Sequence, residues 1–222
     1  MKKMINFFKN QLTQNGYFFK EITPELIFVE NFLSKEQLDT FSSIIDSTLQ
    51  EDWEIEYYAN LKNFCMEKFG RDDVDNLVAE GKFEITQNWK DKNFNILNHE
   101  VYFPIYENLN SMVVNSDPEL HLSGLATIQR MQPGVQLTSH TDQHTDPSIK
   151  YATIIYINDE YSGGELFFPN LNIEIKPKPG TLLVFPGNEQ YEHGVKVVGE
   201  GPIRYVLVGF IKEKDHYKKN RY

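Results

Sequence analysis

The sequence predicts an α+β protein whose core is a jelly roll, that is, a double-stranded β-helix of about eight strands preceded by supporting helices. Two observations predict this fold. Helical periodicity is confined to the first half of the chain. From Leu122 onward, short runs of β-branched and aromatic residues alternate with Gly, Pro, Asn and Asp, which is typical of many short strands. Such a succession of short strands favours a jelly roll.

The expected helices come first along the chain. Ser34 is a candidate N-cap with Gln37 three residues later, and apolar residues follow at helical spacing as far as Leu49. Two further helical patterns cover residues 57–69 and 102–113. We expect these helices to cover one face of a sheet.

Each expected strand is a short apolar run bounded by turn residues. The expected strands cover residues 124–131, 136–140, 151–157, 164–168, 173–175, 181–185, 193–198 and 203–211. The chain therefore divides into an N-terminal helical and extended region that packs on the core, the jelly-roll core itself, and a polar tail, with bounds 1–121, 122–214 and 215–222.

Composition excludes several classes of protein. The 222 residues carry a formal net charge of -10, which argues against a surface that neutralises nucleic-acid phosphates. Cys65 has no partner for an internal disulfide, and lysines interrupt the N-terminal segment where a signal peptide needs an apolar run. No apolar run approaches the roughly 20 residues that span a bilayer. We expect a cytoplasmic protein without a nucleic-acid or membrane partner.

The tripeptide His140-Thr141-Asp142 is the most informative motif. Side chains two residues apart share a face of a strand, so His140 and Asp142 can reach one metal ion if a strand ends there. His193 lies far enough downstream to return on a neighbouring strand. Two imidazoles and one carboxylate with open positions opposite form the ligand set of non-heme Fe(II) oxygenases.

A second His-Thr-Asp follows immediately, with His144 and Asp146 as its possible ligands. Pro147 and Ser148 come directly after it and place this copy in a loop. We therefore assign the metal to the first copy.

Arg204 opens the last expected strand, where strand alternation places it on one face with Val206, Val208 and Phe210. A guanidinium on an apolar face needs an anionic partner, because burying it unpaired is costly. A bound carboxylate held by two hydrogen bonds is the expected partner, and an ion pair with a protein carboxylate is the alternative.

With these residues, the chain resembles the prolyl 4-hydroxylase-like family of 2-oxoglutarate and Fe(II)-dependent dioxygenases over roughly residues 27–212, most closely from Gln132 onward. The segments that carry the resemblance, besides the metal motif, His193 and Arg204, are Pro133-Gly134, Tyr156-Ile157-Asn158, Gly163-Gly164-Glu165-Leu166 and Pro179-Gly180-Thr181-Leu182.

The resemblance implies a role for each site residue. His140, Asp142 and His193 would hold Fe(II), Arg204 would bind the far carboxylate of the cosubstrate 2-oxoglutarate, and Tyr156 would add a hydrogen bond to that carboxylate. Ascorbate is an optional reductant in such enzymes.

The chain departs from the family at two positions. Met131 stands where the family often has a tyrosine, so a hydrogen bond near the metal is either missing or supplied by Gln129. Arg204 stands where collagen-type members carry a lysine.

The resemblance further implies hydroxylation of an unactivated C–H bond, in the first instance of a prolyl residue in a peptide or protein, with O2 consumed and succinate and CO2 released. The alternatives are a hydroxylase of a free amino acid or other small molecule, and a cupin-like metal-binding module without turnover. The acidic balance disfavours a nucleic-acid demethylase of the same superfamily.

Loops at 142–150 and 159–162 are expected to frame the mouth of the site, and residues 83–94 with Trp89 to form a lid. The oligomeric state stays open.

Overall fold

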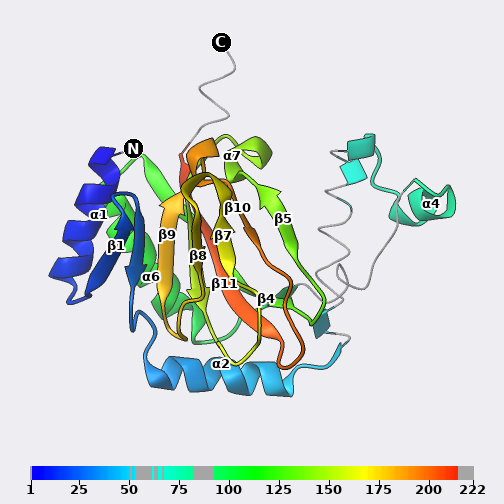
Figure 1. The fold of residues 1–222 in the computed structure, drawn as a ribbon, viewed down its shortest axis with the longest axis horizontal. Coiled ribbons are helices and arrows are strands. Elements are labelled where there is room, and N and C mark those ends of the chain that lie inside the picture. The colour runs from blue at the N-terminus through cyan, green and yellow to red at the C-terminus, as the bar shows by residue number, and fades with distance from the viewer. Residues whose placement is uncertain are drawn as a thin grey trace, which may run out of the picture.

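The computed structural model describes residues 2–50, 52–53, 62, 65–66, 68–82 and 93–214. Most of the helix predicted at 57–69, nearly all of the expected lid with Trp89, and the tail 215–222 lie outside the described residues. Within the described part, two antiparallel sheets form the body of the molecule and helices flank them (Figure 1). The predicted α+β jelly roll is confirmed.

The larger sheet has seven strands, in the order β1 (Phe19–Thr23), β2 (Leu26–Val29), β9 (Leu182–Pro186), β6 (Ile149–Tyr156), β11 (Arg204–Glu213), β4 (Leu120–Met131) and β3 (Asn93–Asn95). The smaller sheet has four, in the order β5 (Leu137–His140), β10 (His193–Val195), β7 (Leu166–Phe168) and β8 (Ile173–Ile175). All strand pairs are antiparallel. The strands predicted from periodicity are all present, with ends that differ by a few residues.

Strands β1, β2 and β3 come from the N-terminal region and extend the larger sheet at its two edges. β1 and β2 form a hairpin whose turn is fixed by the Thr23 hydroxyl, which accepts hydrogen bonds from the backbone N–H groups of Glu25 and Leu26. β1 lies at an edge and buries no residue fully, so its sequence lacks the alternation that predicts a strand. β2 matches the start of the segment that resembles the family.

Two longer helices lie on the outer face of the larger sheet. They are α1 (Lys2–Gln14), which the sequence analysis did not predict, and α6 (Tyr102–Ser116), which it did. α1 packs on α6, and α6 packs on β4. Further helices in the described part of the chain include α2 (Lys35–Ser47), α4 (Val74–Ala79) and α7 (Asp142–Thr145), with short 3-10 turns η1 (Pro169–Leu171) and η2 (Glu189–Tyr191). In Figure 1, α2 runs across the lower end of the sheets and α7 lies at the upper end.

Ser34 forms the predicted capping box of α2. Its side chain accepts a hydrogen bond from the Gln37 N–H, and the Gln37 side chain accepts one from the Ser34 N–H. The helix ends at Ser47, so Leu49 lies beyond it and is 60% exposed. The apolar pattern therefore overestimated the helix by its last half-turn.

Replacing Ser34 by alanine is expected to lower the free energy of unfolding by about 1 kcal/mol, the usual value of an N-cap. Urea denaturation measures this change. Ser43→Ala is the control, because the Ser43 hydroxyl only bonds back to the Asp39 carbonyl within the same helix and alanine suits a helix interior. Equal effects of the two substitutions would contradict the role assigned to the capping box.

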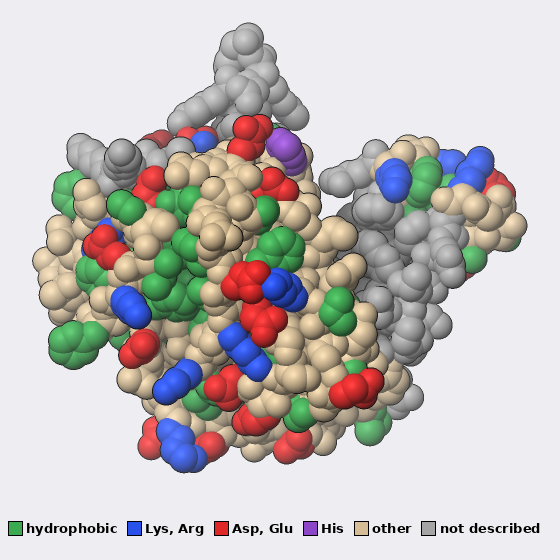
Figure 2. All heavy atoms as spheres, in the orientation of Figure 1, with side chains coloured by type: hydrophobic (Ala, Val, Ile, Leu, Met, Phe, Trp, Pro, Cys, Tyr) green, Lys and Arg blue, Asp and Glu red, His purple; other side chains and the backbone are tan. Residues whose placement is uncertain are grey.

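Two apolar cores hold the layers together. One lies between the larger sheet and the helices, and the other lies between the two sheets. On the molecular face seen in Figure 2, acidic and basic side chains are interspersed. One surface ion pair joins Lys196 Nζ to Glu174 Oε1 at 2.6 Å. In the described part of the chain, no helix combines the length and apolar character that a membrane span requires.

Candidate active site

His140 and His193 are direct cross-strand partners at one end of the smaller sheet. His140 is the last residue of β5 and His193 the first of β10, and their ring centroids are 4.6 Å apart. The following residue, Gly194, permits this close pairing, because a Cβ there would lie 2.6 Å from the carbonyl oxygen of Leu137. The two imidazoles are thus set side by side by backbone hydrogen bonding.

Asp142 lies just beyond the strand, whose predicted end at His140 is confirmed. β5 ends at His140, and Asp142 is the first residue of α7. Thr141 between them is still extended, with φ -116° and ψ 135°, so the alternation of side chains continues for one more residue. One Asp142 oxygen lies 3.8 Å from His140 Nε2, and the other lies 3.9 Å from His193 Nε2.

Backbone carbonyls fix the tautomer of both imidazoles. His140 Nδ1 lies 3.0 Å from the Thr138 carbonyl oxygen, and His193 Nδ1 lies 3.1 Å from that of Tyr191. An N–H on each Nδ1 satisfies these contacts and leaves the Nε2 lone pairs free for a metal. One ligand atom from each of the three residues lies within 4.8 Å of the others.

The electrostatics of the triad suit a bound cation. Burial raises the pKa of Asp142 to about 6, although the nearby His140 opposes this shift. Burial also lowers the pKa of His193 to about 4, so its imidazole is neutral at pH 7. Asp142 Oδ2 is buried and has no hydrogen-bond partner among the described residues. A divalent ion would neutralise this carboxylate, so the three residues fit a metal such as Fe(II).

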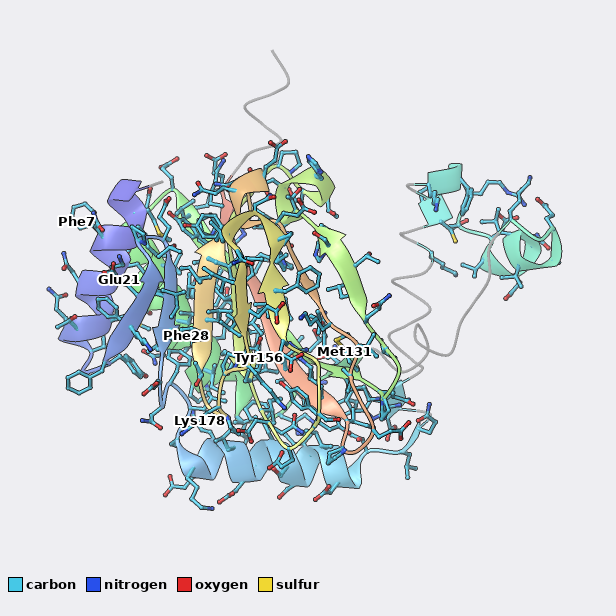
Figure 3. All side chains as sticks on the ribbon, viewed as in Figure 1. Phe7, Glu21, Phe28, Met131, Tyr156 and Lys178 are labelled. Atoms are coloured by element: carbon cyan, nitrogen blue, oxygen red, sulfur yellow. The ribbon has the colours of Figure 1, made fainter. Side chains whose placement is uncertain are left out.

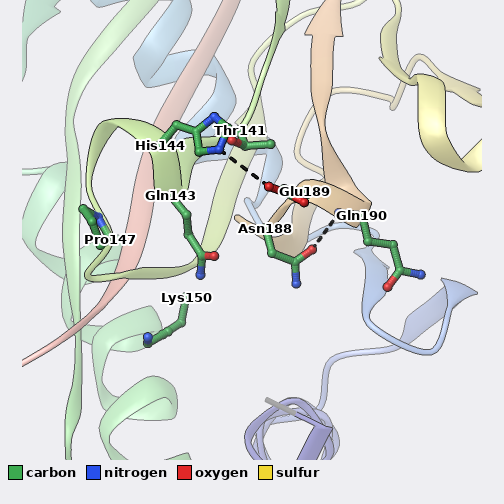
Figure 4. A pocket seen from close by; sticks show the side chains of 8 residues that line it. All are labelled: Thr141, Gln143, His144, Pro147, Lys150, Asn188, Glu189 and Gln190. Carbon is green, nitrogen blue, oxygen red and sulfur yellow. Dashed lines mark hydrogen bonds and ion pairs between the residues drawn. The ribbon is translucent and has the colours of Figure 1, made fainter.

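The second His-Thr-Asp has other partners. Asp146 accepts hydrogen bonds from the Ser148 N–H and hydroxyl and pairs with Lys212 at 3.0 Å. Burial alone would raise the pKa of Asp146, but Ser148 and Lys212 outweigh it and lower that pKa. His144 lines a different pocket, where its Nε2 lies 3.8 Å from Glu189 Oε1 (Figure 4). The structure does not bring His144 or Asp146 into the triad.

A cavity of about 470 Å³ opens between the two sheets beside the triad. Its lining includes the face of β11 that strand alternation predicted, namely Arg204, Val206, Val208 and Phe210, and also Lys212 on the same strand. Ile149, Ala152 and Ile154 from β6 and Thr145 and Asp146 at the end of α7 complete much of its wall. The cavity is large enough for a small dicarboxylic acid together with part of a second molecule.

Arg204 lies in this cavity without an acidic partner. It is 2% exposed, and no ion pair among the described residues includes it. Its guanidinium donates weakly to Tyr156 Oη at 3.4 Å and to Met131 Sδ at 3.6 Å, and its Nε is buried without a hydrogen-bond partner. Tyr156 and Met131, labelled in Figure 3, both belong to the core between the sheets. A buried cation with spare donors is a site for an anion.

The structure places Gln129 in the wall of this cavity and Tyr156 next to Arg204. Gln129 lies opposite Val206 across β4 and β11 and lines the same cavity as Arg204. Tyr156 is fully buried at the end of β6, with its hydroxyl near Arg204. The sequence analysis missed Tyr161, which is 1% exposed and lies beside Arg204 rather than at the mouth. Its position just before Gly163-Gly164 is the signal that could have identified it.

Comparison with known proteins identifies the fold. The profile of the 2OG-Fe(II) oxygenase superfamily matches residues 126–212, which include the triad and Arg204. The match covers less than half of the chain, and over this segment it supports a 2OG-Fe(II) oxygenase. That family implies Fe(II) and 2-oxoglutarate, and the donor set described above fits both.

Individual proteins similar to this chain include prolyl hydroxylases. Human prolyl 3-hydroxylase 2 is 36% identical over 56 residues, which is 23% of this chain and 8% of that protein. The chain thus spans a small part of that relative's length.

Two solved structures share the fold. One is the viral collagen prolyl hydroxylase of Paramecium Bursaria Chlorella virus-1 in complex with 2OG, with TM-score 0.55 and 17% identity over 86% of this chain and 97% of that one. The other is the prolyl hydroxylase of Trichoplax adhaerens in complex with a peptide fragment of hypoxia inducible factor, with TM-score 0.51 and 16% identity over 100% and 94% of the two chains.

Proposed function

We propose that this protein is a 2-oxoglutarate-dependent Fe(II) dioxygenase that hydroxylates a prolyl residue in a peptide or protein. The observation that carries the proposal is one cavity lined by both the metal-binding triad and Arg204. Asp142 and His193 of the triad are buried, and the buried Arg204 has no acidic partner among the described residues. A metal-binding module without turnover has no use for Arg204, so the arrangement favours an enzyme.

Each group of residues has its own task in the proposed reaction. His140, Asp142 and His193 hold Fe(II) from one side, and Arg204 with Tyr156 holds the far carboxylate of 2-oxoglutarate. Gln129 lies on the same wall as Arg204 and is a further polar contact for the cosubstrate. When bound, Fe(II) and 2-oxoglutarate supply the oxidising chemistry, in which one atom of O2 enters succinate as CO2 leaves and the other enters the substrate C–H bond.

The apolar cavity wall helps to keep water from the reacting centre. Val206 and Val208 from β11 and Ala152 and Ile154 from β6 form this wall. Their side chains offer no hydrogen bonds, so water is held there weakly. Exclusion of water strengthens the polar contacts of the triad and of Arg204 and limits side reactions.

The charges in the cavity favour a prolyl residue over a free amino acid. Asp146 and Lys212 are paired with each other at 3.0 Å, so neither is available to a substrate ammonium or carboxylate without breaking that pair. The nearby Ile149, Val208 and Phe210 are apolar and suit an uncharged ring. The two solved neighbours named above are prolyl hydroxylases, one of them bound to a peptide.

The test is coupled turnover by the purified protein with Fe(II), 2-oxoglutarate and O2. We expect succinate release that rises on addition of proline-containing peptides, and a gain of one oxygen atom on the peptide by mass spectrometry. The same peptides with alanine in place of proline are the controls. Stimulation by free amino acids instead of peptides would assign the alternative substrate class, and no succinate under any condition would reject the enzyme.

Ascorbate as reductant and a cytoplasmic location are also part of the proposal. Omission of ascorbate is expected to shorten the linear phase of succinate release. Cell fractionation of the tagged protein tests the location. The division of the chain at residues 121 and 122 stays a prediction, which limited proteolysis tests.

A further inference from the structure

A second buried tyrosine lies next to Arg204. The Arg204 Cζ is 5.2 Å from the ring centroid of Tyr156 and 6.0 Å from that of Tyr161, so the guanidinium lies over both aromatic rings. Tyr161 follows β6 in the loop that leads to β7, and it is 1% exposed. Attraction between the cation and the ring faces helps to hold the guanidinium in place.

The hydroxyl of Tyr161 lies close to Arg204 but makes no hydrogen bond of good geometry within the described part of the chain, and its oxygen is buried. The Nε of Arg204 is in the same condition. Buried polar groups in proteins are nearly always bonded, so two unsatisfied groups at one place call for an explanation. The Tyr161 hydroxyl and the Arg204 Nε–H can each donate a hydrogen bond, and one bound anion can accept both.

The hydroxyl of Tyr161 keeps its proton at neutral pH. Burial raises the pKa of Tyr161 to about 12, although the charge of Arg204 opposes this shift. A protonated hydroxyl can donate to a carboxylate, whereas a phenolate would repel it. The group is therefore in the form that an anion needs.

The ring of Tyr161 is held firmly. A Cβ on Gly164 would lie 3.0 Å from Tyr161 Cε2 and 3.3 Å from Arg204 Cδ, so this glycine is what lets the loop close against both side chains. Lys176 lies with its Nζ 4.3 Å from the centroid of the ring and donates a hydrogen bond to the Tyr161 carbonyl. A group held from two sides is suited to recognising a ligand of fixed shape.

We propose that the Tyr161 hydroxyl is a further donor to the far carboxylate of 2-oxoglutarate, beside Arg204 and Tyr156. The inference rests on the proposed function and adds to it a residue that selects for a 2-oxo acid with a second carboxylate. A carboxylate accepts several hydrogen bonds, so the fork of Arg204 and two tyrosine hydroxyls can all be used.

The test measures binding rather than turnover. Isothermal titration without O2, with Mn(II) in place of Fe(II), gives the Kd of 2-oxoglutarate for the wild type and for Tyr161→Phe. A parallel titration uses 2-oxobutyrate, which keeps the 2-oxo acid group but lacks the far carboxylate. Tyr151→Phe is the matched control, because Tyr151 is a buried tyrosine of β6 that belongs to the core on the opposite, helical side of the sheet.

We expect Tyr161→Phe to raise the Kd of 2-oxoglutarate about tenfold, the usual effect of losing one hydrogen bond to a charged group, and to leave the Kd of 2-oxobutyrate unchanged. Tyr151→Phe is expected to change neither. An unchanged Kd for 2-oxoglutarate in Tyr161→Phe, or equal weakening of both acids, would overturn the inference. Failure of the wild type to bind 2-oxoglutarate with Mn(II) would instead reject the proposed function itself, so the two failures are distinguishable.

Discussion

Replacing Asp142 by alanine is expected to abolish 2-oxoglutarate turnover and to weaken metal binding by more than about 100-fold. Substituting a residue that only hydrogen-bonds to a metal ligand already lowers metal affinity by about 10- to 100-fold. Asp142 is itself a candidate ligand and supplies the only negative charge of the triad, so its loss costs more. His140→Ala is expected to have the same effect. Metal content by mass spectrometry, Mn(II) titration and succinate release measure these changes.

The apo-protein provides a check on folding. Asp142 is buried with an unpartnered oxygen, and a buried carboxylate without a counter-ion costs stability. We therefore expect metal-free Asp142→Ala to unfold at the same temperature as the metal-free wild type or a higher one. A lower unfolding temperature would mean that lost activity reflects lost folding.

The second His-Thr-Asp supplies the matched controls. His144→Ala and Asp146→Asn are expected to keep most of the turnover, since His144 faces another pocket and Asp146 is occupied by Ser148 and Lys212. Loss of metal in these variants together with retention in Asp142→Ala would transfer the site to the second copy.

Replacing Arg204 by alanine is expected to raise the concentration of 2-oxoglutarate needed for half-maximal turnover by about 100-fold or more. Two hydrogen bonds from a guanidinium to a carboxylate account for a change of this size. Metal binding is expected to be largely kept, because Arg204 lies on the larger sheet and both imidazoles lie on the smaller one. Steady-state kinetics at varied 2-oxoglutarate and Mn(II) titration measure the two effects.

Two further variants separate charge from packing. Methionine fills much of the volume of arginine but carries no charge. Arg204→Met therefore tests whether the raised 2-oxoglutarate requirement of Arg204→Ala comes from an empty cavity in the core rather than from the lost charge. Arg204→Lys keeps the charge but not the planar fork and is expected to lie between wild type and Arg204→Met. An unchanged 2-oxoglutarate requirement in Arg204→Met would show that another residue holds the carboxylate.

The strands and the main site residues could be predicted because their signals are local. Alternation along β11 places Arg204 and Val206 on one face, and the cavity is lined by that face. The return of His193 on a strand next to that of His140 was expected from its distance along the chain, but the direct pairing of the two residues depends on the register of the strands. The short helix at Asp142 was not predicted, because its formation depends on contacts such as the hydrogen bond from the Gln143 N–H to the Gly187 carbonyl, far away in sequence.

Other elements could not be predicted because their stability is tertiary. α1 is amphipathic, but its apolar residues Phe8 and Leu12 are buried only because the helix packs on α6, which the sequence does not show. Tyr161 looked like part of an exposed loop. Its burial depends on Gly163 and Gly164, both with positive φ, which fold that loop back onto Arg204.

The division of the site between two sheets links cosubstrate affinity to the spacing of the layers. His140 and His193 move with the smaller sheet, whereas Arg204 moves with the larger one. In the proposed function, 2-oxoglutarate reaches from the metal on the smaller sheet to Arg204 on the larger one. Because the length of the acid is fixed, it binds well at only one spacing of the two sheets. Substitutions that loosen side chains packed between the sheets away from the two imidazoles, such as Leu166 and Leu183, would weaken binding of the acid before they weaken binding of the ion.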